Sequence, residues 1–213
     1  MERPDLIFVT GCNAAGKTSL IRSHLSEFPD YEIIMTDVYK GRSREVFREA
    51  VRTNQNILLE TPFNDEGFRD LIDLAKLAHY QSSLVVLFLK SPAQSIERVA
   101  NRTVLENGLH ISSGNVEHNF MENLKNVAKY FLYFDESHFY YTGERGHNRL
   151  IMRYEKDKLA EYVKNDFAYV QHFANLAYRF ERLATEDKNI IVANKDYRVG
   201  VRNSPVGKGH KLH

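Results

Sequence analysis

The feature that most constrains the fold is a glycine-containing segment near the N-terminus, GCNAAGKTS at residues 11–19. It matches the pattern G-x-x-x-x-G-K-[ST]. An apolar run at residues 5–10 precedes it, and a helical pattern of apolar residues follows it. Small residues let backbone N–H groups turn toward phosphate oxygens, and the N-terminus of the next helix presents its positive end to the same anion. The segment is therefore predicted to be a phosphate-binding loop between a strand and a helix.

Nine consecutive residues are predicted to bind the nucleotide: Gly11, Cys12, Asn13, Ala14, Ala15, Gly16, Lys17, Thr18 and Ser19. We expect Lys17 to reach the β- and γ-phosphates and the Thr18 hydroxyl to ligate Mg²⁺. ATP and Mg²⁺ are therefore the predicted cofactors. The single cysteine, Cys12, excludes an intramolecular disulfide. A small residue at a variable loop position is a simpler interpretation of it than a catalytic thiol.

Overall composition limits the classes of partner. The 213 residues carry a formal net charge of +1 and are 43% hydrophobic. This suits one compact domain and gives no electrostatic basis for tight non-specific nucleic-acid binding. No N-terminal signal and no bilayer-spanning apolar run are evident, so no membrane partner is expected and the protein is predicted to be cytoplasmic.

Strand and helix patterns alternate through the first half of the chain. Strands are expected at residues 31–37, 56–61 and 83–89, and helices at residues 43–53, at about 65–80 and from Pro92 onward. This alternation predicts a three-layer α/β fold with a mostly parallel sheet. Ligands bind beyond the carboxyl ends of such strands, which brings the phosphate loop, Asp37 and Glu60 to one edge.

The second half has a different pattern. Residues 107–115 show little periodicity and are expected to cover the site. A helix is expected at about 116–130, and a hairpin or two edge strands at 138–154. From Lys158 to about Ala184 an apolar stripe predicts one long helix that packs on its own domain or forms a homodimer or partner surface. Residues 190–193 are expected to form a last strand. One domain is thus predicted for residues 1–196, followed by a basic flexible tail at 197–213.

With these residues placed, the chain resembles the zeta-toxin-like P-loop kinases, including the group known as predicted ABC-type ATPases. Residues 11–19 are similar to the family's G-x-N-G-A-G-K-[ST]-[ST], with Ala14 in place of the inner glycine. The resemblance covers about residues 5–142. Further similar stretches are the Glu-Thr pair at 60–61, the R-V-x-x-R and G-G-H-x-[IV] lid at 98–111, and residues 120–126.

Two positions depart from the family pattern. The chain has His-Asn at 118–119, where the family carries one or more arginines, and Tyr-Thr-Gly at 141–143, where it carries Asp-Asn-Ser. The resemblance implies an ATP-dependent phosphotransferase acting on a hydroxyl of a small molecule or nucleotide sugar. It also makes an antitoxin a candidate partner. A nucleotide-binding regulatory switch without kinase activity is the alternative.

Individual side chains have both functional and structural interpretations. Asp37 is predicted to be the general base, or else it caps the next helix. Glu60 orients Mg²⁺-bound water or substrate, or else forms a salt bridge. Arg98 and Arg102, four residues apart on one helix face, clamp phosphate oxygens or are solvated charges.

Lys17, Asp37, Arg98 and Arg102 are thus the predicted catalytic residues. Glu60, Thr61 and the lid residue His110 are assigned to substrate binding, and Thr18 to the metal.

Overall fold

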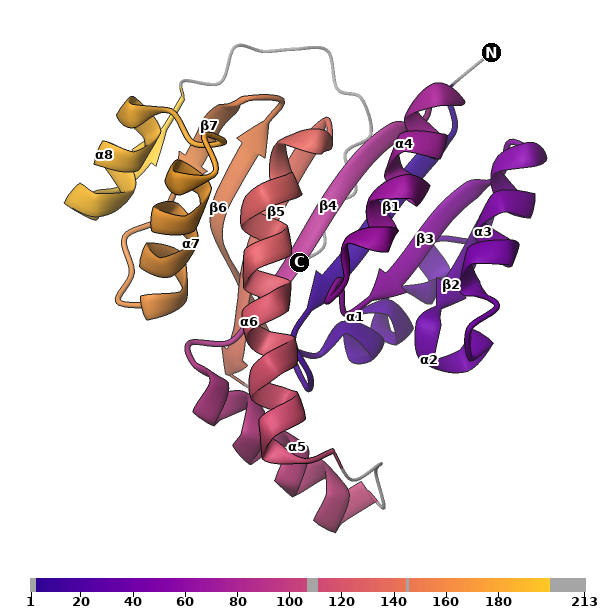
Figure 1. Ribbon diagram of the computed structural model, residues 1–213, viewed down its shortest axis with the longest axis horizontal. Coiled ribbons are helices and arrows are strands. Elements are labelled where there is room, and N and C mark those ends of the chain that lie inside the picture. Colours follow the sequence, from indigo (N-terminus) through magenta and orange to yellow (C-terminus); the bar gives the residue numbers. More distant parts are fainter. Residues whose placement is uncertain (1–2, 107–110, 145, 200–213) are drawn as a thin grey trace.

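The computed structural model describes residues 3–106, 111–144 and 146–199 (Figure 1). The strands are β1 (Asp5–Gly11), β2 (Tyr31–Met35), β3 (Asn56–Thr61), β4 (Gln81–Phe88), β5 (Glu136–Glu144), β6 (His147–Glu155), β7 (Lys158–Tyr162) and β8 (Tyr197–Arg198). The α-helices are α1 (Lys17–Ser23), α2 (Thr36–Tyr39), α3 (Ser43–Arg52), α4 (Arg69–Leu77), α5 (Pro92–Glu106), α6 (Ser113–Tyr130), α7 (Ala168–Arg179) and α8 (Thr185–Ala193). Short 3-10 turns occur at Leu25–Glu27, Glu66–Phe68 and Phe131–Tyr133.

All eight strands form one sheet in the order β2-β3-β1-β4-β5-β6-β7-β8. The first five strands of that order are parallel to one another, and β6, β7 and β8 are added antiparallel. β1 is therefore central, between β3 and β4. The carboxyl ends of β1, β2 and β3 share one edge, and Met35 pairs in register with Glu60. The predicted mostly parallel sheet is confirmed.

Helices cover both faces of the sheet, as alternation along β4 shows. Leu87 lines a small cavity with Leu20 of α1, whereas the ring of the next residue, Phe88, stacks on Tyr169 beside it, with ring centroids 4.5 Å apart. Successive side chains of a strand point to opposite faces, so α1 and α7 lie on opposite sides. The central strands read as continuous apolar runs because both of their faces are buried. The predicted three-layer α/β fold is confirmed.

The C-terminal region differs from the prediction of one long helix at residues 158–184. It forms the strand β7, a loop, α7 and then α8. The chain turns back into the sheet after β6 at Lys156, which has φ 55°, and Asn165 accepts a hydrogen bond from the Phe167 N–H in the loop before α7. α7 ends before Glu181, which has φ 57°. The seven-residue spacing of apolar residues in this region is therefore shared among β7, α7 and the loop after α7, and does not mark a single helix.

The predicted homodimer surface loses its basis for the same reason. Tyr162, Tyr169 and Leu183 of the apolar stripe are buried within the domain. The strand predicted at 190–193 is instead part of α8. Tyr197 and Arg198, assigned to the flexible tail, pair with β7, and the remainder of that tail from residue 200 lies outside the described residues. In the described part of the chain, no helix has the length and apolar character needed to cross a bilayer.

Candidate active site

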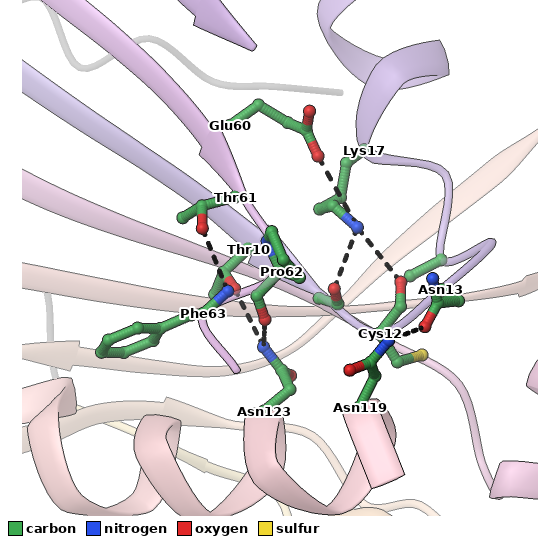
Figure 2. Close-up of polar contacts among 12 residues, drawn as sticks. Thr10, Cys12, Asn13, Lys17, Glu60, Thr61, Pro62, Phe63, Asn119 and Asn123 are labelled. Carbon is green, nitrogen blue, oxygen red and sulfur yellow. Dashed lines mark hydrogen bonds and ion pairs between the residues drawn. The ribbon is translucent and has the colours of Figure 1, made fainter. Parts of the chain in front are cut away.

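The predicted phosphate loop connects β1 to α1 at the carboxyl edge of the sheet (Figure 2). Gly16, immediately before α1, has φ 93°, a conformation that glycine adopts without the steric cost of a side chain. A Cβ atom at Gly11 would collide with the carbonyl oxygen of Leu87 in β4. Gly16 is thus required by its left-handed backbone conformation, and Gly11 by the close packing of β1 against β4. The first N–H groups of α1 have no partner within the helix, which makes this end an anion-binding position.

Carbonyl oxygens of the loop are held from outside by three side chains. Ser95 Oγ donates to Asn13 O at 2.7 Å, and Arg98 Nη1 donates to Ala14 O at 3.3 Å, both from α5. Thr142 Oγ1 of β5 donates to Ala15 O at 2.7 Å. With its carbonyls turned toward these donors, the loop is held in one conformation. Thr142 lies in the stretch where the sequence departs from the family's Asp-Asn-Ser.

Lys17 lies at the centre of the site. Its Nζ donates to Gly11 O at 2.9 Å and to Cys12 O at 3.2 Å, and lies 3.6 Å from Glu60 Oε1. The Glu60 residue is 2% exposed, and its Oε2 has no hydrogen-bond partner among the described residues. Burial raises the pKa of the Glu60 carboxyl, attraction to Lys17 lowers it, and the Asp37 charge raises it; the net shift is upward. The salt-bridge interpretation of Glu60 is therefore observed, with one carboxylate oxygen still unpaired.

Asp37 lies in the first turn of α2 and is exposed to solvent. Met35, two residues before Asp37, pairs in register with Glu60, which places Asp37 just beyond the end of β2 at the edge where β3 also ends. The neighbouring Thr36 places a buried hydroxyl at the same edge without a hydrogen-bond partner in the described chain. The sheet edge thus gathers Lys17, Glu60 and Asp37, as the strand order predicted.

The other predicted site residues differ in burial and in hydrogen bonding. Arg102 of α5 has a buried Nε without a hydrogen-bond partner among the described residues, whereas Arg98 is bonded to the loop. Thr61 is fully buried, and its hydroxyl accepts a hydrogen bond from Phe63 N, so it shapes the turn after β3. Thr18 is half-buried in the first turn of α1 and the adjacent Ser19 is exposed. His110 lies outside the described residues.

Cys12 is not suited to nucleophilic chemistry. The residue is 3% exposed, and burial raises the pKa of its thiol, which keeps it protonated at neutral pH. The small-residue interpretation of this position is the one that its environment favours.

Sequence reasoning missed a row of asparagines on α6. Asn119, Asn123 and Asn126 are spaced by four and three residues, so they share one helix face. That face contacts both the phosphate loop and the turn after β3. The spacing of three amide side chains within an otherwise apolar helix pattern was the available signal.

Ala14 should be a point of stored backbone strain. It has φ 56°, a left-handed conformation that costs a non-glycine residue about 1–2 kcal/mol. Ala14→Gly should relieve this strain and, after the added chain entropy of glycine, stabilise the protein by about 1 kcal/mol. This corresponds to a rise in Tm of roughly 2–4 °C in thermal unfolding.

Ala15→Gly is the matched control for this measurement, because Ala15 is fully buried and is not among the positive-φ residues of the described chain. It should lower Tm. Equal shifts in the two variants would contradict the strain at Ala14.

Glu60 should make stability depend on pH. Because its folded-state pKa is raised, the stability linked to the protonated carboxyl is complete below the unfolded value of about 4.3 and is lost as pH rises through the folded pKa. Glu60→Gln cannot ionise, so its free energy of unfolding relative to the parent should increase with pH across that window. Urea unfolding from pH 4 to pH 8 measures the difference, with the exposed Glu45→Gln as control. A difference that stays constant with pH would contradict the raised pKa.

No family model matches the chain. A uridine kinase of Streptococcus agalactiae serotype V is 38% identical over 77 residues, which is 34% of this chain and 37% of that relative. A uridine kinase of Streptococcus pneumoniae strain Hungary19A-6 is 47% identical over 76 residues, 33% of this chain and 36% of the relative. The chain therefore matches little more than a third of the length of these curated relatives.

Solved structures are similar over most of the chain. One, from work on the PezAT chromosomal toxin-antitoxin system of Streptococcus pneumoniae, has a TM-score of 0.50 at 15% identity and covers 91% of this chain and 85% of its own. The AvrRxo1-ORF1:-ORF2 crystal structure with ATP has a TM-score of 0.57 at 13% identity, with 91% and 77% covered. At identities this low, the structural similarity establishes a shared fold and nothing beyond it. The chain therefore has the α/β fold of these structures, as the sequence predicted.

Proposed function

We propose that the protein is an ATP-dependent phosphotransferase that phosphorylates a hydroxyl group of a small molecule. The observation that carries the proposal is the convergence of Lys17, Glu60 and Asp37 at the carboxyl edge of the sheet, beside the phosphate loop. The uridine kinase relatives and the ATP-containing AvrRxo1 structure support the same reaction class.

Each residue has a role in this reaction. Lys17, Arg98 and Arg102 bind and neutralise phosphate oxygens. The backbone N–H groups of the loop orient the same phosphates. The acceptor oxygen forms a bond to the γ-phosphorus as the bond to the ADP oxygen breaks, and Asp37 accepts the acceptor's proton. The exposed position of Asp37 leaves it accessible to an acceptor. Glu60 and Thr61, at the end of β3, are proposed to contact the acceptor. His110 is proposed as a further acceptor contact.

The residues fit Mg²⁺, the second predicted cofactor. Thr18 supplies a hydroxyl at the helix start, and Glu60 supplies a buried carboxylate oxygen that lacks a partner in the described chain. Within the described residues there is no group of three or more His, Cys, Asp or Glu side chains that could hold a metal alone. This is the donor set expected for Mg²⁺, which is bound by one or two protein oxygens together with substrate phosphates. When bound, the ion supplies charge neutralisation between the phosphates.

Transfer of label tests the proposal. The protein is incubated with γ-labelled ATP and Mg²⁺, with uridine, a panel of nucleotide sugars and a metabolite extract supplied separately as acceptors. Label should appear in a new phosphorylated product. ATP binding without transfer to any acceptor would favour the alternative, a nucleotide-dependent regulatory switch.

An antitoxin is proposed as the macromolecular partner, because the PezAT neighbour comes from a toxin-antitoxin system and AvrRxo1-ORF1 was solved together with AvrRxo1-ORF2. Co-purification of the chain with the product of an adjacent small gene, together with loss of transfer in the complex, would support this. Unchanged transfer in a complex with that product would contradict a neutralising role.

Arg98 and Arg102 should differ in their kinetic effects. Arg102→Ala should lower kcat by about 10²-fold with little change in ATP affinity, because the Arg102 Nε has no hydrogen-bond partner in the described chain and the guanidinium can act on charge that develops during transfer. Arg98→Ala should mainly weaken ATP binding, because Arg98 holds the loop through Ala14 O. Steady-state kinetics and ATP titration separate the two effects. Parent-like values in both variants would make these arginines ordinary surface charges.

A further inference from the structure

Two asparagines of α6 connect the phosphate loop to the turn that follows Glu60, here called the β3 turn (residues 61–64). Figure 2 shows Asn119 and Asn123 side by side along α6, both pointing toward the sheet edge. They come from a helix more than 50 positions later in the chain than either partner segment.

Asn119 uses both ends of its amide. Its Nδ2 donates to Asn13 Oδ1 in the phosphate loop at 3.0 Å, and its Oδ1 accepts from Asn64 Nδ2 in the β3 turn at 2.8 Å. The three side chains form a continuous amide chain from one wall of the site to the other. A single side chain that donates to one wall and accepts from the other fixes the spacing between them.

One helical turn later, Asn123 repeats the arrangement deeper in the protein. Its Nδ2 donates to Thr10 Oγ1 at 2.9 Å, at the end of β1, and to Pro62 O at 2.6 Å. Asn123 is 2% exposed. Buried amides are generally hydrogen-bonded, and here the Nδ2 group donates both to the end of β1, next to the phosphate loop, and to the β3 turn.

The β3 turn needs such support. Phe63 has φ 47° although it is a bulky residue, and its side chain is fully buried. Strain of this kind persists only where the surroundings hold it. Thr61 Oγ1 accepts from Phe63 N, and Asn126 Nδ2 donates to Phe63 O at 3.0 Å. The turn directly after Glu60 is therefore held in its strained conformation from α6.

We infer that Asn119 is a positioning residue that couples the phosphate loop to the β3 turn, while Asn123 ties the end of β1 to that turn, so that a nucleotide bound on the loop orders the acceptor side of the site. The inference rests on the proposed function for its kinetic consequence, because a displaced β3 turn misplaces an acceptor relative to the γ-phosphate. Its structural consequence, transmission of order from one wall to the other, holds for any nucleotide-binding role.

Hydrogen–deuterium exchange on the full chain tests the coupling without requiring catalysis. Exchange is compared with and without the non-hydrolysable analogue AMP-PNP and Mg²⁺ in the parent, Asn64→Ala and Asn119→Ala. In the parent, the analogue should slow exchange in both the phosphate loop and the β3 turn. In Asn64→Ala, which removes only the last link of the amide chain, the phosphate loop should remain protected while the protection of the β3 turn falls by several-fold.

Asn175→Ala is the matched control, because it truncates an exposed helical asparagine, in α7, that lies outside the site. It should behave like the parent. The double variant Asn64→Ala/Asn119→Ala should lose no more β3-turn protection than Asn119→Ala alone, because both changes cut one chain. Melting temperatures identify any variant that is unfolded, and Asn64→Ala, in a partly exposed turn, keeps the test decisive if Asn119→Ala does not fold.

Two results would overturn the inference: a parent in which AMP-PNP leaves the β3 turn unchanged, or an Asn64→Ala variant with full protection of that turn. Label transfer is measured in parallel. If the parent transfers no phosphate, the proposed function fails while the exchange data still decide the coupling. If the parent transfers phosphate, Asn64→Ala should raise the acceptor KM and lower the ratio of transfer to ATP hydrolysis, with ATP affinity close to that of the parent.

Discussion

Lys17→Ala should reduce phosphate transfer by about 10²–10³-fold, since one preorganised donor aimed at developing charge contributes on that scale. ATP affinity should fall as well, because the ammonium group is the cation held closest to the loop carbonyls and would meet the phosphates there. Initial rates with labelled ATP and equilibrium ATP titration measure the two effects. Lys125→Ala, on the exposed side of α6, is the control for loss of a lysine.

The same substitution leaves the Glu60 carboxylate buried without its cation, so lower stability is also expected. The double variant Lys17→Ala/Glu60→Gln separates the two causes: it should regain most of the lost Tm and none of the lost transfer. Unchanged turnover in the well-folded single variant would remove the phosphate-loop interpretation.

Asp37→Asn should reduce transfer by about 10²–10⁴-fold, because asparagine keeps the shape and hydrogen bonding of the residue but cannot accept the acceptor's proton. ATP affinity and Tm should stay close to those of the parent, since Asp37 is exposed in a four-residue helix. The helix-cap alternative predicts retained activity, because asparagine caps nearly as well as aspartate, but the structure does not support it: Asp37 lies inside α2, and Met35 precedes that helix with no side-chain cap. Asp30→Asn, an exposed aspartate just before β2, is the charge-matched control. Intact transfer by Asp37→Asn would exclude a base role.

The site was predictable where the signal is local or topological. Residues 11–19 carry their own strand, turn and helix signals, and the structure places them between β1 and α1 as expected. Asp37 and Glu60 were placed together by one rule, that parallel strands end at a common edge. The Lys17–Glu60 ion pair is a consequence of that edge.

Other features could not be read from the sequence, for physical reasons. A seven-residue spacing links Tyr162, Tyr169, Leu176 and Leu183. The same spacing results when a strand, a helix and a loop each place one or two of these residues against the domain. Tertiary pairing of β7 with β6 decided the outcome. The bridging role of Asn119 depends on partners far away in the chain, and an amide in a helix has no local signature of what it will contact.

The central position of β1 has a consequence for synthesis of the protein. Leu6 pairs with Ile57 on one side and with Ser82 on the other, so the first apolar strand has neither neighbour until β3 and then β4 have left the ribosome. At a synthesis rate of about 5–20 residues per second, the apolar strand β1 stays unpaired for several seconds. Nascent chains in which β1 has left the ribosome and β3 has not should therefore bind ribosome-associated chaperones strongly, and those in which β4 has also emerged should be released from them.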